Sequence, residues 1–274
     1  MRCSRIFLNM LLVAALFSAC NSDSRQLRER AEAQWREGNY DDAIRLFTLL
    51  YERDKDGKYA PGALLNIGNI YYLNQRNLEE AVETYKKLAR EFPGKAEEYE
   101  ADKQLAKIYE YEIEDLSQTL LEYDRILENT DLENRAEILF KRASIYFKQE
   151  DYDRAWRELR QIEESGTAGT HLAAQVSLKL GSISQIRQRY EEAASYFERV
   201  VGSPCQECRR QAILSLTKTY EALYKFDRAI ETVQKLDQYP EDKKRVDQEV
   251  QRLTAEKNKL GAGGASDWEQ AIHK

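Results

Sequence analysis

The sequence predicts an all-α fold made of a repeated pair of helices, and three observations lead to this prediction. Charged residues make up 33% of the 274 residues, with only 12 glycines and 4 prolines, a balance more typical of helices with solvated faces than of sheets. A short segment beginning at Gly38, Gly-Asn-Tyr-Asp-Asp-Ala-Ile, returns in altered form along the chain. No proline falls inside a predicted helix, where it would cost about 3 kcal/mol, and Pro61 opens one.

Residues 1–19 predict a signal peptide. Arg2 and Arg5 form a basic start, and the apolar run 6–17 is too short to span a bilayer. Two small residues and then Cys20 follow. One interpretation is cleavage at an ordinary site, with Cys20 an incidental thiol.

The segment 16–20, Leu-Phe-Ser-Ala-Cys, also resembles a bacterial lipobox. This resemblance implies that Cys20 is acylated (palmitate is the expected type of chain) and becomes the mature N-terminus. Asn21, in place of Asp, implies the periplasmic face of the outer membrane by the same resemblance; the periplasmic leaflet of the inner membrane is the alternative. Helical periodicity begins near Arg25, so residues 20–24 are a short lipidated tether that holds the protein within about 20 Å of the lipid.

The recurring segment defines six predicted second helices, each with a small residue at the same station. Successive stations are 36 or 38 residues apart; they are Ala43, Ala81, Thr119, Ala155, Ala193 and Ala229. Twelve or thirteen residues earlier stands a small residue of the preceding helix: Ala31, Gly68, Ala106, Ala143, Gly181 and Thr217. Four residues after each second-helix station stands a large apolar residue: Phe47, Tyr85, Tyr123, Leu159, Phe197 and Val233. Antiparallel helices approach closely where a small residue meets a ridge, so this pattern predicts helical hairpins.

This pattern resembles the tetratricopeptide repeat, whose period is 34 residues. The resemblance implies a right-handed α-solenoid of about six helix pairs over 25–240. The polar-backed stretch 241–260 predicts a C-terminal capping helix, as a terminal repeat requires. Residues 261–274 are glycine-rich at their start and predict a flexible tail, with a docking peptide as the alternative.

In this family a partner binds the concave face, lined by first-helix residues shortly after the small station. Transferred to this sequence, the predicted partner-binding groove contains Trp35, Asn69, Tyr72, Lys107, Tyr111, Phe147, Gln185 and Lys218. Aromatic side chains dominate many protein interfaces, which favours a groove. The alternative is that these rings only pack between repeats.

The composition argues against several functional classes. The net charge is −6, and the sequence has no basic stripe of the kind that nucleic-acid binding requires. Only two histidines occur, and no phosphate-binding or dinucleotide-binding glycine loop is present. We therefore expect no catalytic residues, cofactor, metal or small-molecule substrate.

One motif needs separate treatment. Cys205 and Cys208 form a C-x-x-C motif at the predicted start of the sixth first helix. A local disulfide is the main prediction, with free thiols and catalytic thiol redox chemistry as alternatives. Zinc would require two further ligands, which the neighbouring sequence does not offer.

Together these features resemble the tetratricopeptide lipoprotein of the outer-membrane β-barrel assembly machine and related periplasmic proteins. The resemblance implies a non-catalytic, lipid-anchored scaffold that binds envelope proteins or peptides. A subunit of an export or cell-wall (Tol-Pal-type) complex is one alternative. A periplasmic thiol redox protein using Cys205 and Cys208 is an alternative of a different class.

Overall fold

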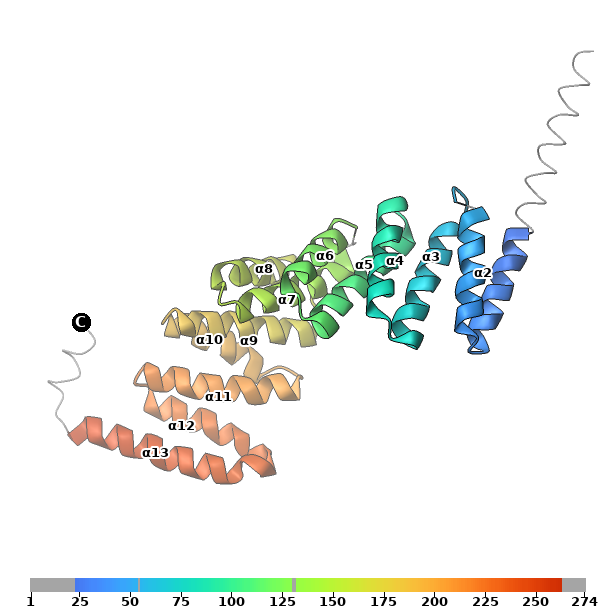
Figure 1. Ribbon diagram of the computed structural model, residues 1–274. Helices are drawn as coiled ribbons and strands as arrows, with labels where there is room; N and C mark the ends of the chain where they lie inside the picture. Colours follow the sequence, from blue (N-terminus) through green and yellow to red (C-terminus); the bar gives the residue numbers. More distant parts are fainter. Residues whose placement is uncertain (1–22, 54, 130–131, 263–274) are drawn as a thin grey trace, which may run out of the picture. The chain divides into compact units, whose positions relative to one another are not determined.

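The computed structural model describes residues 23–53, 55–129 and 132–262, and all regular secondary structure in them is helical (Figure 1). The predicted signal peptide 1–19, Cys20 and the tail beyond residue 262 lie outside the described residues. The chain divides into two compact units, 1–130 and 131–274. Within each unit, successive helices pack against one another, which confirms the all-α repeat fold.

The N-terminal unit contains three helix pairs. Its helices are 23–36, α2 (Tyr40–Arg53), α3 (Ala60–Asn69) continued by the π-helical turn η1 (Ile70–Gln75), α4 (Leu78–Glu91), α5 (Ala96–Ile108) continued by the π-helical turn η2 (Tyr109–Ile113), and α6 (Leu116–Asn129). The predicted tether ends at residue 24, whereas the first helix begins at residue 23.

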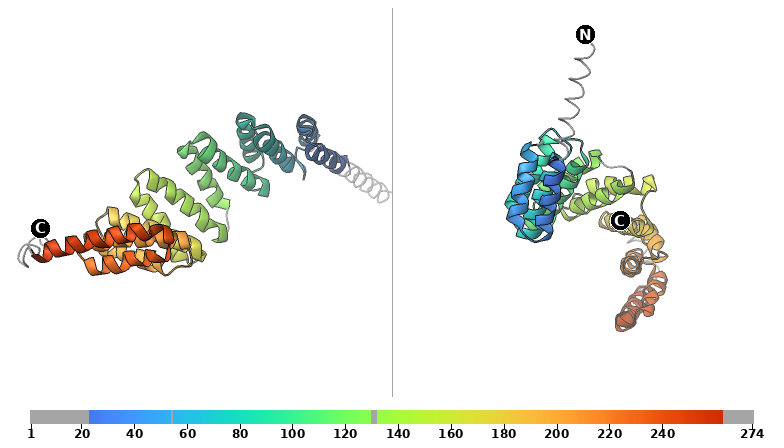
Figure 2. Two further views of the ribbon diagram at one scale, coloured as in Figure 1. Left: turned by 90° about the horizontal axis from the view of Figure 1, so that it is seen from below. Right: turned by 90° about the vertical axis from the view of Figure 1, so that its right-hand side faces the viewer.

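The C-terminal unit contains three more pairs and a final helix. Its elements are α7 (Leu132–Lys148), α8 (Tyr152–Ser165), α9 (Thr170–Ile186), α10 (Tyr190–Val201), α11 (Gln206–Ala222), α12 (Phe226–Gln234), the 3-10 turns η3 (Lys235–Gln238) and η4 (Pro240–Asp242), and α13 (Lys243–Ala262). Helix α13 lies along α12 (Figure 2) and buries Val246 and Leu253, as expected of a capping helix. The bidentate ion pair of Arg210 with the buried Asp242, at 2.6 and 2.8 Å, holds the start of this cap on α11.

Small and large residues meet where the two helices of a pair approach each other. A Cβ atom added to Gly68 would lie 2.5 Å from Cε1 of Tyr85, and one added to Gly181 would lie 2.6 Å from Cε1 of Phe197. Both rings are fully buried. At Gly68 and Gly181, therefore, the small residue recognised in the sequence lets the two helices of a pair approach closely.

The polar residue before three of the second helices, α4, α6 and α8, has a local role. Asn77, Asp115 and Asp151 each accept a hydrogen bond from the backbone N–H three residues later, at 3.2, 3.0 and 3.0 Å. These are N-caps, which satisfy a donor that the helix itself leaves free. The recurrence therefore reflects helix initiation as well as packing.

Every turn within a helix pair contains one residue with a positive φ angle, five residues before the second-helix station. These residues are Gly38, Arg76, Glu114, Glu150, Gln188 and Tyr224. Only the first is glycine, so five of the six turns place a side chain in the left-handed region, where L-residues are disfavoured.

The two π-helical turns have a cause in the sequence. The first-helix and second-helix stations are thirteen residues apart in the second and third repeats, and twelve apart in the other four. Turns η1 and η2 occur in those two longer repeats. A π turn holds an extra residue, so the insertion is absorbed locally without moving the packing stations.

Candidate functional site

The predicted groove begins at Trp35, on the first helix of the chain. Its ring is half-buried and makes an edge contact with Phe47, with centroids 6.4 Å apart. The indole Nε1 donates a hydrogen bond to Oδ1 of Asn74 in η1, at 2.9 Å. Trp35 therefore joins the first repeat to the second, and part of its ring remains accessible.

Tyr72, in η1, lies between the second and third repeats. Only 3% of this residue is exposed, and its hydroxyl donates to Oε1 of Glu112 in η2 at 3.5 Å. The ammonium group of the exposed Lys107 lies 5.6 Å from the ring centroid. Burial, with the nearby Glu112 carboxylate, raises the pKa of the Tyr72 phenol. The ring packs between repeats, and its contacts place the two π turns side by side.

Asn69, the last residue of α3, contacts a buried tyrosine of the same helix pair. Its Oδ1 accepts a hydrogen bond from the hydroxyl of Tyr85 at 2.7 Å. Burial raises the pKa of this tyrosine well above its ordinary value, so the phenol remains a donor. The half-buried amide of Asn69 thus fixes the position of the Tyr85 ring, which packs against Gly68 because glycine has no side chain.

The largest exposed apolar side chains near these residues come from the π turns. Leu73 in η1 is 54% exposed, and Tyr111 and Ile113 in η2 are 61% and 45% exposed. We call these three residues the π-turn surface. Tyr111 was among the predicted groove residues, whereas Ile113 was not. The sequence signal for this surface is the spacing of thirteen residues between the first-helix and second-helix stations, because the π turns occur in the two repeats that have it.

In the C-terminal unit the predicted groove residues mostly connect repeats. Phe147 is half-buried, with its ring centroid 5.5 Å from that of Tyr152 and 5.0 Å from Nζ of Lys179. Burial, and then the charge of Lys148, lower the pKa of Lys179.

Gln185 makes a second connection of this kind in the C-terminal unit. Its Nε2 donates to Oγ1 of Thr219 at 2.9 Å and to the carbonyl of Ser215 at 3.3 Å. Lys218 is exposed on the same helix as these acceptors. The amide of Gln185 therefore joins α9 to α11.

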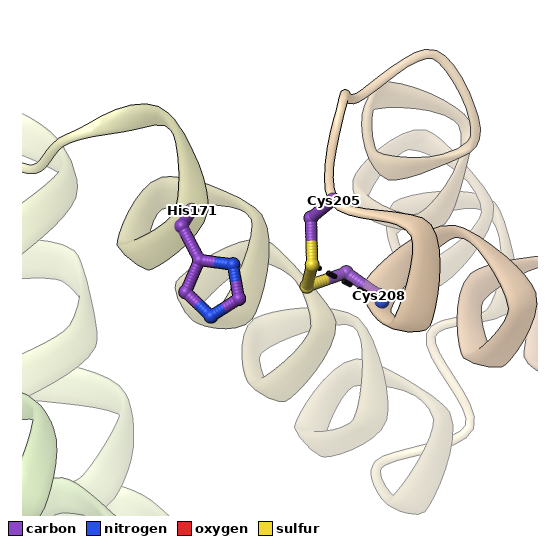
Figure 3. Close-up of side chains that lie close together, drawn as sticks. All are labelled: His171, Cys205 and Cys208. Carbon is purple, nitrogen blue, oxygen red and sulfur yellow. Dashed lines mark hydrogen bonds between the residues drawn. A yellow bond between two sulfur atoms is a disulfide. The ribbon is translucent and has the colours of Figure 1, made fainter.

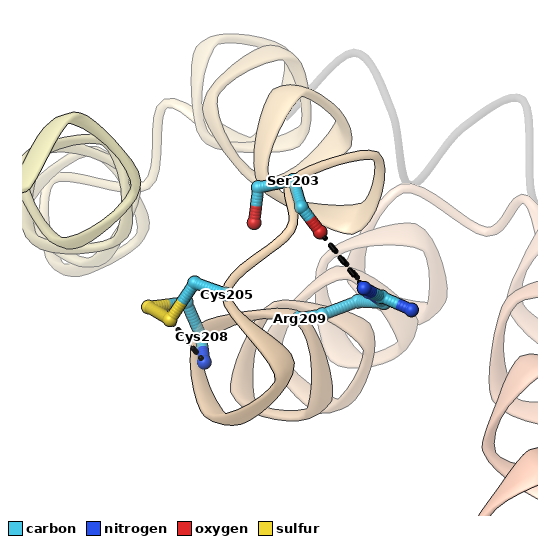
Figure 4. Close-up of a disulfide and its surroundings, with 4 residues drawn as sticks. All are labelled: Ser203, Cys205, Cys208 and Arg209. Atoms are coloured by element: carbon cyan, nitrogen blue, oxygen red, sulfur yellow. Dashed lines mark hydrogen bonds between the residues drawn. A yellow bond between two sulfur atoms is a disulfide. The ribbon is translucent and has the colours of Figure 1, made fainter. Parts of the chain in front are cut away.

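Cys205 and Cys208 are joined by a disulfide at the start of α11 (Figure 4). Cys205 is the N-cap residue, and its Sγ accepts a hydrogen bond from the backbone N–H of Cys208 at 3.2 Å. Arg209 donates to the carbonyl of Ser203 at 3.0 and 3.2 Å, which closes the preceding turn. The two cysteines are 9% and 4% exposed. The disulfide thus connects the loop to the first turn of the helix.

Comparison with known proteins places this architecture in a family. The tetratricopeptide repeat model matches residues 28–96 and 123–207, more than half of the chain. The chain belongs to the tetratricopeptide repeat family. Tetratricopeptide proteins are interaction scaffolds that bind other proteins or peptides, and in general they are not catalysts. No curated protein matches the chain.

Solved structures support the same fold. A tetratricopeptide repeat protein from Parabacteroides merdae ATCC 43184 superposes with a TM-score of 0.50 at 17% identity, over 91% of this chain and 96% of that one. YrrB, a tetratricopeptide protein with an unusual peptide-binding site, gives 0.52 at 19% identity, over 71% and 92%. The Naa15/Naa10 complex bound to HypK-THB gives 0.57 at 17% identity, over 84% of this chain and 34% of that one. Among the described helices of this tetratricopeptide protein, none has both the length and the apolar character of a membrane span.

Proposed function

We propose that this tetratricopeptide protein is a non-catalytic scaffold of the bacterial cell envelope that binds a polypeptide segment of another protein on its N-terminal unit. The lipid on Cys20 would anchor it to the periplasmic face of the outer membrane. Assembly of outer-membrane proteins is the process we favour, in line with the resemblance to the lipoprotein of the β-barrel assembly machine.

The observation that carries this proposal is the π-turn surface. Leu73, Tyr111 and Ile113 expose roughly half of their apolar side chains from adjacent turns. The contact of Tyr72 with Glu112 holds these turns next to each other. Exposed large apolar side chains on adjacent turns are candidate contacts for a partner, and π turns are frequent at functional sites.

Polar groups around the π-turn surface suit a polypeptide. Lys107 is exposed, and Glu112 lies on η2 between Tyr111 and Ile113. Such neighbours can pair with backbone amides or with charged side chains of a bound segment. YrrB has a peptide-binding site, and we extend a peptide ligand to this chain as part of the proposal.

The anchoring is supported by the N-terminal sequence. The lipobox-like segment ends at Cys20, and the first described helix begins at residue 23. Such a short connection would hold the N-terminal unit close to the lipid. Membrane fractionation after labelling with a fatty-acid analogue tests the anchor, because Cys20→Ser should lose both the label and the membrane association. Outer-membrane and inner-membrane fractions distinguish the two proposed locations.

Site-specific crosslinking in intact cells tests the binding surface. A photoreactive amino acid at Tyr111 should crosslink a defined envelope protein, and a matched probe at Tyr224 should not. Tyr224 is a suitable control because it is 57% exposed but lies in the C-terminal unit. Leu73→Ser combined with Ile113→Ser should abolish the Tyr111 crosslink while circular dichroism is unchanged. Equal crosslinking from both probes would contradict the proposed surface.

The identity of the crosslinked protein separates the processes. A component of β-barrel assembly supports the favoured function, whereas an export or cell-wall component supports the alternative complex.

The thiol redox alternative rests on the Cys205–Cys208 disulfide at a helix N-terminus. It requires insulin reduction that Cys205→Ser abolishes.

A further inference from the structure

His171 brings a third metal-ligating side chain to the cysteine pair. It is the second residue of α9, and its exposed ring faces the disulfide at the start of α11 (Figure 3). One ligand atom from each of His171, Cys205 and Cys208 can be chosen so that all three lie within 4.8 Å of one another.

The repeat itself produces this cluster. His171 stands ten residues before the first-helix station Gly181, and the cysteines stand twelve and nine residues before the next station, Thr217. Equivalent positions on neighbouring first helices are adjacent in a stacked repeat. Helices α9 and α11 do pack against each other, so a group bound here would connect the fifth and sixth repeats.

We propose that, when the disulfide is reduced, Cys205, Cys208 and His171 bind one zinc ion. The C-x-x-C spacing is typical of zinc sites, and thiolate sulfur with imidazole nitrogen is a ligand set that zinc prefers. With Zn–S bonds of about 2.3 Å and Zn–N bonds of about 2.0 Å, ligand atoms of a tetrahedral site are about 3.5–3.8 Å apart. The histidine nitrogen lies within 4.8 Å of both sulfur atoms and must approach them by at most about 1.3 Å, which rotation of an exposed ring permits. The sulfur atoms, 2.06 Å apart in the disulfide, must separate by about 1.7 Å once it is reduced.

The position of the cysteines favours the thiolate state that zinc requires. They lie at the N-terminus of the 17-residue helix α11, where the helix dipole stabilises negative charge. The N–H of Cys208 already points at Sγ of Cys205. The cluster has three members within the described part of the chain, so water completes a tetrahedral site.

Disulfide and metal are mutually exclusive states of the pair. A dithiol reductant supplies two electrons and two protons to the Cys205–Cys208 bond and becomes a disulfide itself, leaving two thiols. Each thiol then releases its proton to water as its sulfur bonds to zinc, and neutral His171 contributes a nitrogen lone pair. The oxidised pair carries no thiolate, so the site binds zinc only after reduction.

Cobalt titration of the full chain in detergent tests this proposal. Cys3→Ser and Cys20→Ser remove the other two cysteines, and a phosphine, which becomes phosphine oxide by taking an oxygen atom from water, reduces the disulfide. The reduced protein should bind one equivalent of Co²⁺, with sulfur-to-cobalt charge-transfer and tetrahedral d–d bands that Zn²⁺ then removes. The oxidised protein should give neither band.

Two histidine variants provide a matched comparison, because His171 and His273 are the only histidines. His171→Ala should weaken zinc binding at least about tenfold, and His273→Ala should leave it unchanged. His171 is exposed, so its replacement leaves the fold intact, which circular dichroism checks. Absence of the cobalt bands from the reduced protein, or equal affinity of the two histidine variants, would overturn the proposal.

Discussion

The N-terminal and C-terminal units are each built from three helix pairs, yet they differ in how their first helices end. In the N-terminal unit the second and third first helices close with the π turns η1 and η2, which expose Leu73, Tyr111 and Ile113. In the C-terminal unit α9 and α11 end without a π turn. Its special features are the disulfide and the cap helix α13 instead.

This difference follows from one inserted residue in each of two repeats. The insertion leaves Gly68 packed on Tyr85 just as Gly181 packs on Phe197, so the core contact is shared by both units. What changes is the turn that follows, where an extra residue must be accommodated. Repeat proteins can therefore vary their exposed surface while preserving the contacts that stack the helices.

The largest expected effect comes from truncating the cap of the C-terminal unit. Leu253 on α13 is fully buried, so Leu253→Ala should cost about 2–5 kcal/mol of unfolding free energy. Hydrogen exchange should show lost protection in α11, α12 and α13, with protection of the N-terminal unit unchanged. The control Leu260→Ala removes a side chain that is 39% exposed on the same helix and should have little effect. Equal loss of protection in both units would mean that they do not unfold separately.

Adding a methyl group at the shared contact should destabilise both units. Gly68→Ala and Gly181→Ala should each cost about 1–3 kcal/mol in urea unfolding, because the new Cβ overlaps a buried ring. Phe197→Leu should recover part of the loss in Gly181→Ala.

Gly62→Ala is the matched control for these glycine substitutions. This helical position has nothing within 4 Å of an added Cβ. The substitution should therefore stabilise α3 by up to about 1 kcal/mol. A cost at only one of Gly68 and Gly181 would show that the contact is not equivalent in the two units.

The N-terminal unit contains a buried acid without a hydrogen-bond partner among the described residues, whereas the buried Asp242 of the C-terminal unit is paired with Arg210. Asp102 on α5 is fully buried, and neither of its carboxylate oxygens has a hydrogen-bond partner among the described residues. Desolvation, then the nearby charges of Glu122 and Glu98, raise its pKa from 3.8 to about 7; Arg125 opposes this. The pKa of Glu122 itself is raised by burial.

Asp102→Asn should therefore stabilise the protein at pH 8 by about 1–3 kcal/mol. Because the pKa of Asp102 is higher in the folded protein than its ordinary value of 3.8, protonation of this residue favours the folded state. The resulting stability is fully present below pH 3.8 and is lost as the pH rises through about 7. The advantage of the variant should accordingly shrink between pH 8 and pH 5 in thermal unfolding. The control Glu128→Gln, at an exposed position on α6, should not produce this pH dependence. A constant advantage at all pH values would exclude titration of Asp102 as the cause.

The smallest effect concerns the turns within the helix pairs. Gln188→Gly, after an ordinary helix, and Arg76→Gly, after η1, should each raise the unfolding free energy by about 0.5–1 kcal/mol, because both residues have a positive φ angle. Gly38→Ala should lower it by a similar amount. Thermal unfolding measures all three, and a gain restricted to Gln188→Gly would indicate that the π turn restrains Arg76 differently.

Sequence periodicity predicted the six helix pairs and their packing stations because both depend on short-range regularities. The contact of Gly181 with Phe197, for example, depends on the small volume of the first residue and the large volume of the second, and both are visible in the sequence. The capping side chains of Asn77 and Asp151 act within one helical turn, so they too are visible in the chain. The cysteine pair was visible as a motif for the same reason.

The exposure of the predicted groove residues was not accessible from one sequence. Tyr72 stands four residues after Gly68, and Tyr111 stands five residues after Ala106. Only 3% of Tyr72 is exposed, against 61% of Tyr111 and 54% of Leu73, which is also five residues after its station. One step along a helix turns a side chain to a different face, and the structure shows that the earlier of these two positions contacts the next repeat, as Tyr72 does with Glu112. Likewise, the approach of His171 to Cys205 and Cys208 depends on the stacking of α9 on α11.

The sequence by itself determined the helical hairpins, their boundaries near proline and capping residues, and the stations of closest approach, because these follow from local propensity and side-chain volume. Only the tertiary structure decided that the inserted residues become π turns, that Tyr72 is buried while Leu73 is exposed, that Asp102 has no hydrogen-bond partner in the described part of the chain, and that His171 faces the disulfide. These outcomes depend on contacts between residues that are distant in the chain, and such contacts exist only once the repeats have stacked.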